Sequence, residues 1–435
     1  MNKSLSPHKL SAASMARAIR RGEVTSEEIV RGSLEHAARS ERVLRAWHAL
    51  DADTALTQAA RRDLEHRKGL LHGVPIAVKD LSDTADYDTS YGSPAYRGNR
   101  PAVDAACVAA LRAAGAVILG KTATVEFGAS RPCETTNPHN PNHTPGGSSA
   151  GSAAVVADCQ VPLAIGTQTG GSIIRPASFC GVVGFKPTYG ILSPGGTKSY
   201  AWSLDTVGGF ANSVSDVSLL FDALRGAEKV TEISAGDQVP RVGIFLGPFK
   251  DVASSQAIAR LIEVASICER NGATLCDIPA PTAFTYSLDW QRTISRYEMA
   301  RSLLPEMLAF NESTLGSDLY GEIQASRLVS EGDYLRAKQG GFHLNEDLAQ
   351  LFSDIDILLT LSVPGEAPLG LHSTGDATFC LSWSLVGMPT VNLPAGPGAG
   401  QLPLGIQLVG KRHHDETLLR FAAWVEHVIN KVRKN

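Results

Sequence analysis

The sequence predicts a single α/β domain built on one mostly buried β-sheet. Apolar runs of strand length alternate with amphipathic helical segments along most of the chain, the pattern of an α/β domain. Several of these runs are continuously apolar rather than alternating, which indicates strands covered on both faces. No internal repeat, low-complexity block or linker interrupts the pattern. We therefore expect one domain over 1–435, with segments 1–68, 69–210 and 211–435.

Composition excludes several classes of partner. The chain has 435 residues, of which 43% are apolar and 19% charged, as in globular proteins. A net charge of −4 provides no basic surface for nucleic acid. No apolar run reaches the length of a membrane span. We expect neither nucleic acid nor a membrane as a partner.

Cysteine usage and the first residues predict a cytoplasmic location. The seven cysteines are scattered, odd in number and form no CxxC pair, which is typical of reduced thiols. Residues 1–7 lack the apolar segment of a signal peptide.

The N-terminal segment is predicted to be helical. Thr25 and Glu28 have the spacing of a capping box, and an apolar stripe follows at helical spacing through residue 37. Residues 51–67, rich in alanine and charge, form a second predicted helix. Neither segment carries candidate chemistry.

The run 71–80 is a predicted strand that ends in Lys79 and Asp80. A helix at 104–114 and a strand at 115–122 follow. The latter matches GxxxxGK[ST], but its variable residues are Ala-Val-Ile-Leu, which must form the buried strand itself. A phosphate loop needs a flexible turn there, so we reject a nucleotide site.

No metal or cofactor site is predicted. Residues 137–145 form a loop rich in Pro and Asn. Its prolines exclude the helix that would place His139 and His143 on one face as ligands, so we interpret both as solvated. A small-residue helix is expected over 149–157.

The rest of the chain continues the alternation of strands and helices. The segment 286–334 is predicted to be mostly helical and is rich in aromatic residues. The other predicted elements are strands within 179–188 and at 242–245, 355–361, 389–394 and 404–409, and helices at 254–269 and 414–432.

The stretch 146–186 is dense in glycine and serine. Ser148 and Ser172 each follow a Gly-Gly pair. Backbone without side chains can present N–H groups to an anion or a developing oxyanion. Two tight turns filled by serine are the alternative interpretation. Together with Lys79 upstream, the two serines favour catalysis.

A lysine can serve as the base for a serine nucleophile. The chain has no Gly-x-Ser-x-Gly elbow and no Asp and His in a clear triad context. Burial at the end of an apolar strand lowers a lysine pKa, because it disfavours the ammonium form. Pairing with Asp80 would raise that pKa, so Asp80 is expected to point away. The run 169–172 could supply N–H groups around the nucleophile.

These motifs resemble the amidase signature family, serine amidohydrolases with a Ser–cis-Ser–Lys triad. They are 73–80 (GVPIAVKD), 145–149 (PGGSS), 166–176, 185–188 (FKPT) and 404–409 (LGIQLV). The resemblance covers nearly the whole chain and implies a single α/β/α domain in which helices cover a large mixed sheet. It implies Lys79 as base, Ser148 as the relay serine after a cis peptide, and Ser172 as nucleophile.

The resemblance also implies residues around the triad. The oxyanion hole consists of the N–H groups of Thr169, Gly170, Gly171 and Ser172. Substrate-binding positions are Arg175, Thr167, Gly147 and Ser149. No cofactor and no metal are implied.

Two positions depart from the commonest family pattern. Gln168 stands where Asp is usual, and Arg175 lies three residues after Ser172 rather than two. Both features, and 371–376 (LHSTGD), are similar to the malonamidase-like branch, whose arginine binds a substrate carboxylate. A buried ion pair of Arg175 with Asp205 is an equal alternative.

The expected function is hydrolysis of a small amide through an acyl-enzyme on Ser172. Carbamate or ester hydrolysis, as in urethanases, is an open alternative. So is the amidase subunit of a tRNA-dependent amidotransferase, although Gln168 and Arg175 differ from that branch. A catalytically inactive binding protein conflicts with the presence of all three triad residue types. The substrate and the oligomeric state stay open, a homodimer included.

Overall fold

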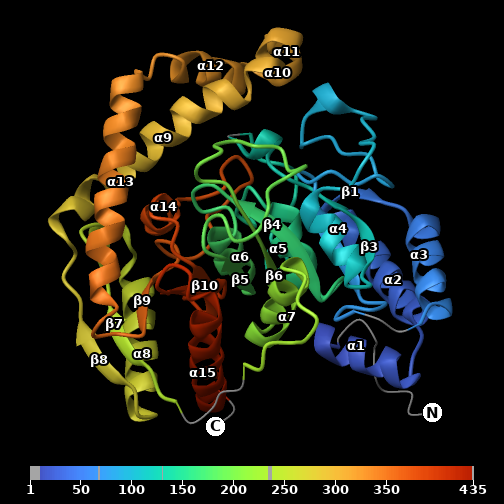
Figure 1. The fold of residues 1–435 in the computed structure, drawn as a ribbon, viewed down its shortest axis with the longest axis horizontal. Helices are drawn as coiled ribbons and strands as arrows, with labels where there is room; N and C mark the ends of the chain where they lie inside the picture. Colours follow the sequence, from blue (N-terminus) through green and yellow to red (C-terminus); the bar gives the residue numbers. More distant parts are fainter. Residues whose placement is uncertain (1–9, 67–68, 130, 234–237, 434–435) are drawn as a thin grey trace.

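An eleven-stranded mixed sheet runs through the molecule in the order β1-β3-β2-β4-β6-β5-β10-β11-β9-β7-β8 (Figure 1). The computed structural model describes residues 10–66, 69–129, 131–233 and 238–433. The N-terminal residues 1–7 and Arg67, used in the predictions above, lie outside these ranges. The strands are β1 Trp47–Leu50, β2 Pro75–Lys79, β3 Val117–Thr122, β4 Leu163–Gln168, β5 Val183–Lys186, β6 Thr206–Ala211, β7 Arg241–Ile244, β8 Thr274–Asp277, β9 Ile357–Leu361, β10 Thr390–Pro397 and β11 Pro403–Val409.

Parallel strands lie on both sides of an antiparallel centre. β2 is parallel to β3 and β4, and β7 is parallel to β8 and β9. The strands from β4 through β6, β5, β10 and β11 to β9 pair antiparallel, as does β1 with β3. The chain is thus one α/β domain with a large mixed sheet, as the sequence predicts.

Helices cover both faces of this sheet (Figure 1). They are α1 Ala12–Arg21, α2 Ser26–Leu44, α3 Ala52–Leu64, α4 Ala106–Ala113, α5 Ala150–Ala157, α6 Ile174–Cys180, α7 Val214–Leu224, α8 Ser255–Arg270, α9 Ser287–Ser302, α10 Leu304–Ala309, α11 Glu312–Leu315, α12 Ser317–Ser326, α13 Glu331–Leu351, α14 Thr378–Leu385 and α15 Asp415–Arg433. The capping box of Thr25 and Glu28 begins α2, as predicted.

The two faces of β2 show why the active residues share one side of the sheet. Ile76 and Val78 pack in the core cluster formed with α1, α4 and α7. Ala77 packs in the opposite cluster with the small residues of α5. Side chains alternate along a strand, so Lys79 follows Ala77 onto the face covered by α5.

The helices α9 to α13 form an arm beside the sheet (Figure 1, top and left). Met299, Leu303 and Leu319 from this arm pack against Phe127 and the neighbouring aromatic residues. The arm therefore covers loops at one end of the sheet. The predicted helical segment 286–334 is broken into shorter helices, with Pro305 in the first turn of α10 and Gly316 between α11 and α12.

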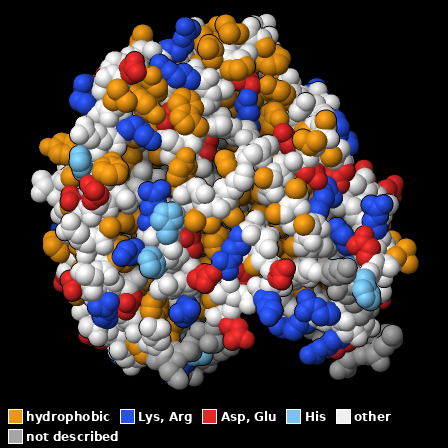
Figure 2. Space-filling view, in the orientation of Figure 1, with side chains coloured by type: hydrophobic (Ala, Val, Ile, Leu, Met, Phe, Trp, Pro, Cys, Tyr) orange, Lys and Arg blue, Asp and Glu red, His pale blue; other side chains and the backbone are white. Residues whose placement is uncertain are grey.

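Several other predictions need correction. The helix predicted over 51–67 ends at Leu64. The strands β4 and β6, the helices α6, α7 and α14, and the edge strands β1 and β8 were not predicted as elements. In the described ranges no helix has both the length and the apolar character to span a membrane. Charged side chains of both signs are spread over the face shown in Figure 2.

Candidate active site

Lys79 ends β2 with its side chain fully buried. Its Nζ donates to Ser148 Oγ and to Thr167 Oγ1, each at 2.8 Å. Burial lowers the pKa of Lys79 to about 7, although the nearby Asp205 carboxylate raises it. An amine with this pKa is partly neutral near pH 7, as a base must be.

Ser148 lies in the segment that links the 137–145 loop to α5. The Gly147–Ser148 peptide bond is cis, as the resemblance implies. The Ser148 carbonyl accepts from Thr124 Oγ1 at 3.1 Å and from the Val125 N–H at 3.2 Å. These contacts fix the main chain of Ser148 beside Lys79.

Ser172 lies in the turn between β4 and α6, with its side chain 9% exposed. A Cβ on Gly171 would lie 2.9 Å from Ala377 Cβ, and one on Gly170 would lie 2.8 Å from Leu381 Cδ2. Glycine is therefore required at position 171, where this turn passes α14, whereas a side chain at position 170 would displace the end of the Leu381 side chain.

The peptide groups of this turn are oriented by hydrogen bonds to their carbonyls. The Thr169 carbonyl accepts from Gln291 Nε2 at 3.2 Å, and the Gly170 carbonyl accepts from Ser384 Oγ at 2.6 Å. The Gly171 carbonyl accepts from the N–H of Arg175 at 2.9 Å. In a trans peptide the next N–H points opposite to the carbonyl.

The N–H groups of Gly170, Gly171 and Ser172 consequently point away from these anchors. Among the described residues none of the three has an acceptor. Free N–H groups beside a serine can stabilise an oxyanion. Sequence reasoning missed Gln291 and Ser384, which lie far along the chain and carry no local motif.

Gln168 takes the place of the usual Asp without adding a charge. Its Oε1 accepts the N–H groups of Ile173 and Ile174 at 2.8 and 3.0 Å, at the start of α6. Its Nε2 donates to Ser384 Oγ at 3.0 Å. Gln168 therefore links the N-terminus of α6 to α14.

Arg175 binds main-chain carbonyls rather than an acidic side chain. Its Nε and Nη2 donate to the Gly147 carbonyl at 3.2 and 2.7 Å, and Nη1 donates to the Gly375 carbonyl at 2.5 Å. The predicted alternative of an ion pair with Asp205 is wrong, because Asp205 accepts from other groups. Burial lowers the pKa of Arg175 to about 10, so the group stays charged at neutral pH. Three of the five guanidinium N–H groups are thus engaged, and the other two have no acceptor in the part of the chain that the structure describes.

Asp205 is instead held by four donors. Thr169 Oγ1 donates to Oδ1 at 2.6 Å. Ser199 Oγ and the N–H groups of Tyr200 and Ala201 donate to Oδ2 at 2.9, 2.8 and 3.0 Å. Burial raises the pKa of Asp205 to about 6. This carboxylate therefore ties the turn before Ser172 to the loop 199–201.

Two other predicted substrate-binding residues hold the backbone or the base. Ser149 is fully buried and exchanges hydrogen bonds with the main chain of Thr167, at 3.2 and 3.3 Å. Thr167 accepts from Lys79 through its hydroxyl. Ser149 therefore supports β4, whereas Thr167 contacts the base directly.

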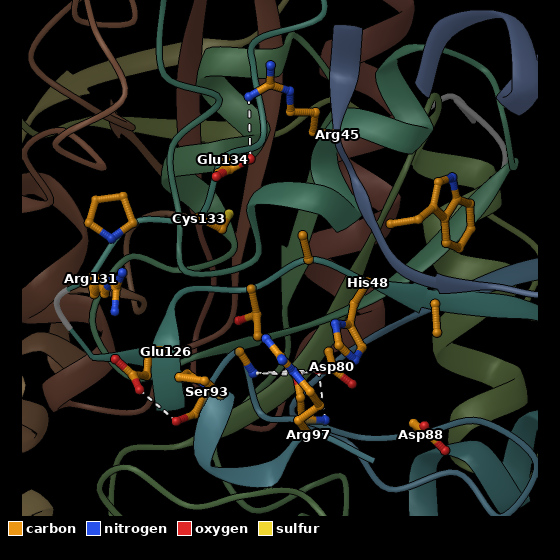
Figure 3. A pocket seen from close by; sticks show the side chains of 18 of the residues that line it. Arg45, His48, Asp80, Asp88, Ser93, Arg97, Glu126, Arg131, Cys133 and Glu134 are labelled. Carbon is orange, nitrogen blue, oxygen red and sulfur yellow. Dashed lines mark hydrogen bonds and ion pairs between the residues drawn. The ribbon is translucent and has the colours of Figure 1, made fainter. Parts of the chain in front are cut away.

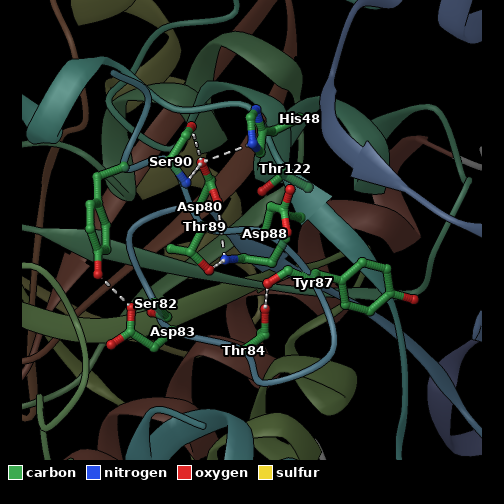
Figure 4. Close-up of polar contacts among 12 residues, drawn as sticks. His48, Asp80, Ser82, Asp83, Thr84, Tyr87, Asp88, Thr89, Ser90 and Thr122 are labelled. Carbon is green, nitrogen blue, oxygen red and sulfur yellow. Dashed lines mark hydrogen bonds and ion pairs between the residues drawn. The ribbon is translucent and has the colours of Figure 1, made fainter. Parts of the chain in front are cut away.

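Asp80 pairs with groups other than Lys79, as predicted, and Figure 4 shows it beside Ser90 and His48. Its Oδ1 lies 3.0 Å from Lys121 Nζ, and both side chains are fully buried. Its Oδ2 accepts the N–H and O–H of Ser90 at 3.0 and 2.6 Å. Lys121 also donates to Thr89 Oγ1 at 2.6 Å. The lysine of the rejected GxxxxGK[ST] match thus pairs with Asp80.

Two cavities lie near these residues. One, of about 310 Å³, is lined by Ser148, Thr167 and Thr169 and by residues of the loop 194–207. The other, of about 830 Å³, lies between segments 45–49, 88–98 and 123–134 and contains no triad residue (Figure 3). In it Glu126 accepts from Ser93 Oγ at 2.6 Å. The smaller cavity is the one that reaches the candidate catalytic groups.

The described histidines, cysteines and acidic residues form no cluster of three that could hold a metal ion. The sequence predicts solvated histidines in the 137–145 loop, but both have a partner in the protein. His139 Nε2 and His143 Nδ1 each lie 2.8 Å from a main-chain carbonyl, those of Cys180 and Ala367.

Comparison with known proteins identifies the family. The model of the Amidase family matches residues 28–419. The chain belongs to the amidase family. It is therefore a serine amidohydrolase, a hydrolase acting on amide C–N bonds.

Relatives in this family match the chain over almost their whole length. A glutamyl-tRNA(Gln) amidotransferase subunit of Roseiflexus sp. (strain RS-1) is 31% identical over 466 residues, covering 95% of each chain. The solved structure of an amidase is 28% identical with a TM-score of 0.88, covering 96% of this chain and 99% of that one. Native peptide amidase from Stenotrophomonas maltophilia is 29% identical with a TM-score of 0.81, covering 98% of each.

Proposed function

We propose that the protein hydrolyses a small amide through an acyl-enzyme on Ser172. The observation that carries this proposal is the buried hydrogen bond between Lys79 and Ser148, at 2.8 Å. It lies beside a turn with three N–H groups that have no acceptor among the described residues. Neutral Lys79 takes the proton of Ser148, and Ser148 takes that of Ser172. Ser172 Oγ then attacks the carbonyl carbon, and the oxyanion lies among the N–H groups of Gly170, Gly171 and Ser172.

Collapse of the tetrahedral intermediate breaks the C–N bond. The proton returns from Ser148 to the leaving nitrogen, because an amide does not expel an amine anion. Water then attacks the Ser172 ester with Lys79 and Ser148 again removing its proton, and the carboxylic acid leaves. Carbamates and esters can follow the same steps and are included in the proposal.

Arg175 has a proposed role beside the triad. It holds the Gly147 carbonyl next to Ser148. Its remaining N–H groups can bind a carbonyl or carboxylate oxygen of the substrate, as in the malonamidase-like branch.

The test is labelling with a fluorophosphonate that reacts with activated serines. Peptide mass spectrometry should locate one adduct, on Ser172, and Lys79→Ala should slow its formation. Ser172→Ala serves as the control and should take up no label. An adduct found only at another residue would remove Ser172 as the nucleophile.

The second candidate is the amidase subunit of an amidotransferase. The similarity to the glutamyl-tRNA(Gln) amidotransferase subunit favours it. Such a subunit works in a complex, so the purified chain would have little amidase activity without its partners. Robust turnover of simple amides by the lone chain favours the independent hydrolase.

A cytoplasmic location is also proposed. Six of the seven cysteines are thiols outside any disulfide bond, namely Cys107, Cys133, Cys180, Cys268, Cys276 and Cys380. Unpaired cysteines in this number are typical of a reducing compartment.

A further inference from the structure

The 310 Å³ cavity lies on the side of the relay serine. Ser148 and Thr167, both buried, line it together with Leu81, Gly128 and the segment 194–207, which ends in β6. Of the described residues that line it, none is Ser172, Gly170 or Gly171. The cavity therefore adjoins the group that returns the proton, rather than the acyl-bearing oxygen.

The position of the cavity beside Ser148, taken with the proposed function, indicates which part of the substrate occupies it. The leaving nitrogen must come within hydrogen-bond reach of Ser148 Oγ to receive its proton. A substituent on that nitrogen then extends into the space that Ser148 lines. A primary amide, which releases ammonia, would leave this space unfilled.

We propose that the substrate is an N-substituted amide whose leaving amine carries an uncharged, ring-sized group that occupies this cavity. The volume is at the lower end of the range of ligand pockets. The aromatic residues Tyr200 and Trp202 are among its walls, and Trp202 is 45% exposed. Aromatic rings pack favourably against such walls.

The charges of the cavity explain why the group is uncharged. Its two charged lining residues are Lys198 and Asp205. Lys198 forms an ion pair with Glu306 of α10, and Tyr96 donates to the same carboxylate at 2.7 Å. Asp205 is satisfied by its four donors. An ionic leaving group would lose its water and find no free partner of opposite charge.

Four acetamides that differ only in the leaving amine test the proposal. They are acetamide, acetanilide, 4-acetamidobenzoate and 4-(aminomethyl)acetanilide, giving no substituent, a neutral ring, an anionic ring and a cationic ring. We expect kcat/KM for acetanilide to exceed each of the other three by at least about tenfold, the factor for roughly 1.4 kcal/mol. Equal or better turnover of acetamide or of either charged anilide overturns the proposal.

Two charge variants make the test specific to this cavity. Glu306→Gln leaves Lys198 without its ion-pair partner, so 4-acetamidobenzoate should gain relative to acetanilide. Lys198→Met leaves the Glu306 carboxylate without its cation, so 4-(aminomethyl)acetanilide should gain instead. Tyr286→Ala, which removes an exposed aromatic side chain outside the cavity, is the matched control and should leave the ratios unchanged. The assignment is contradicted if Glu306→Gln does not raise kcat/KM for 4-acetamidobenzoate relative to acetanilide, or if Lys198→Met does not raise kcat/KM for 4-(aminomethyl)acetanilide relative to acetanilide.

Binding without chemistry provides an independent readout. Calorimetry on Ser172→Ala should show acetanilide binding more tightly than acetamide or either charged anilide. Preference for acetamide together with fluorophosphonate labelling of Ser172 overturns the cavity assignment and leaves the proposed function standing. No turnover of any amide and no labelling of Ser172 overturns both.

Discussion

At the scale of single residues, burial lowers the pKa of Lys79 and the charge on Asp205 opposes this shift. The resulting pKa is about 7; besides burial, Asp205 and Cys133 raise it and Arg175 lowers it. Protonated Lys79 has no lone pair and cannot act as a base. Activity should therefore fall on the acidic side as Lys79 protonates.

Asp205→Asn should shift this acidic limb to lower pH. Removing the carboxylate removes an influence that favours the ammonium form, so the pKa of Lys79 falls. The measurement is kcat/KM for acetanilide across the acidic limb and the plateau above it, with Lys79→Ala expected to lack the limb. Ser199→Ala keeps the Asp205 carboxyl group and removes only one of its hydrogen bonds, so its limb should shift much less than that of Asp205→Asn. An acidic limb that shifts equally in Asp205→Asn and Ser199→Ala would show that the shift comes from a structural change rather than from the lost charge.

Arg175→Lys should lower kcat/KM for neutral amides by about tenfold, and for acidic amides by more. Lysine keeps the charge but loses the paired contacts of Nε and Nη2 to the Gly147 carbonyl. A lost charge-assisted hydrogen bond is worth about 1.5–3 kcal/mol. Propionamide and malonamate are the matched substrates. Equal losses on both, with a lower Tm, would assign Arg175 to structure alone.

The sequence reveals the reacting residues better than the residues that orient them. Lys79 and Ser148 are expected together from their motifs, and a hydrogen bond joins them in the structure. Gln291 and Ser384 could not be predicted, because they reach the turn at 169–172 only through the packing of α9 and α14. The contact of Arg175 with the Gly375 carbonyl could not be predicted for the same reason, since the two residues are 200 positions apart.

At the scale of elements, small residues in α5 allow this helix to lie directly on neighbouring backbone. A Cβ on Gly151 would lie 2.2 Å from the Ala46 carbonyl oxygen and 2.7 Å from the Ala123 nitrogen. Neither backbone atom can give way cheaply. Helix α5, which follows Ser148, is thereby held at a fixed distance from this neighbouring backbone.

Gly151→Ala should lower the free energy of unfolding by about 1–3 kcal/mol, the usual cost of overpacking. Urea unfolding measures it. Gly321→Ala is the control, because nothing lies within 4 Å of a Cβ on this glycine in α12. That variant should be at least as stable as the wild type, by up to about 1 kcal/mol. Equal stability of the two variants would contradict the close packing of α5.

Elements with strong local patterns could be predicted, and those that depend on tertiary packing could not. β6 contains Gly208 and Gly209, which weaken any strand signal. Glycine is required at both positions because neighbouring strands lie very close. A Cβ on Gly208 would lie 2.2 Å from the Phe185 carbonyl oxygen, and one on Gly209 would lie 2.6 Å from the Ala164 carbonyl oxygen. The stretch 286–334 has helical composition throughout, but Pro305 and Gly316 divide it.

At the scale of the whole molecule, Lys186 makes stability depend on pH. It ends β5 fully buried and donates to the Pro187 carbonyl at 2.9 Å. Burial lowers its pKa to about 7, although Asp415 raises it. Between this value and the unfolded pKa of about 10.5 the unfolded chain binds more protons, so stability rises with pH. Below about pH 7 the cost of burying the charge is fully present.

Lys186→Met should therefore be more stable than the wild type by a margin that shrinks with rising pH. The margin should be largest below about pH 7, and above that it should change by at most about 1.4 kcal/mol per pH unit. Urea unfolding of both proteins, at several pH values on either side of neutrality, measures the difference. A margin independent of pH would mean that Lys186 does not change its protonation on folding.

The order of synthesis of the chain separates the catalytic residues from the groups that orient the turn before Ser172. Lys79, Ser148 and Ser172 are all synthesised in the first half of the chain. The groups that orient the turn before Ser172 come from α9 and α14, and β10 and β11 insert between β5 and β9. A nascent chain thus carries its reactive serines long before the donors that aim the N–H groups of this turn exist. Translation itself delays assembly of the hydrolytic centre until most of the polypeptide has emerged.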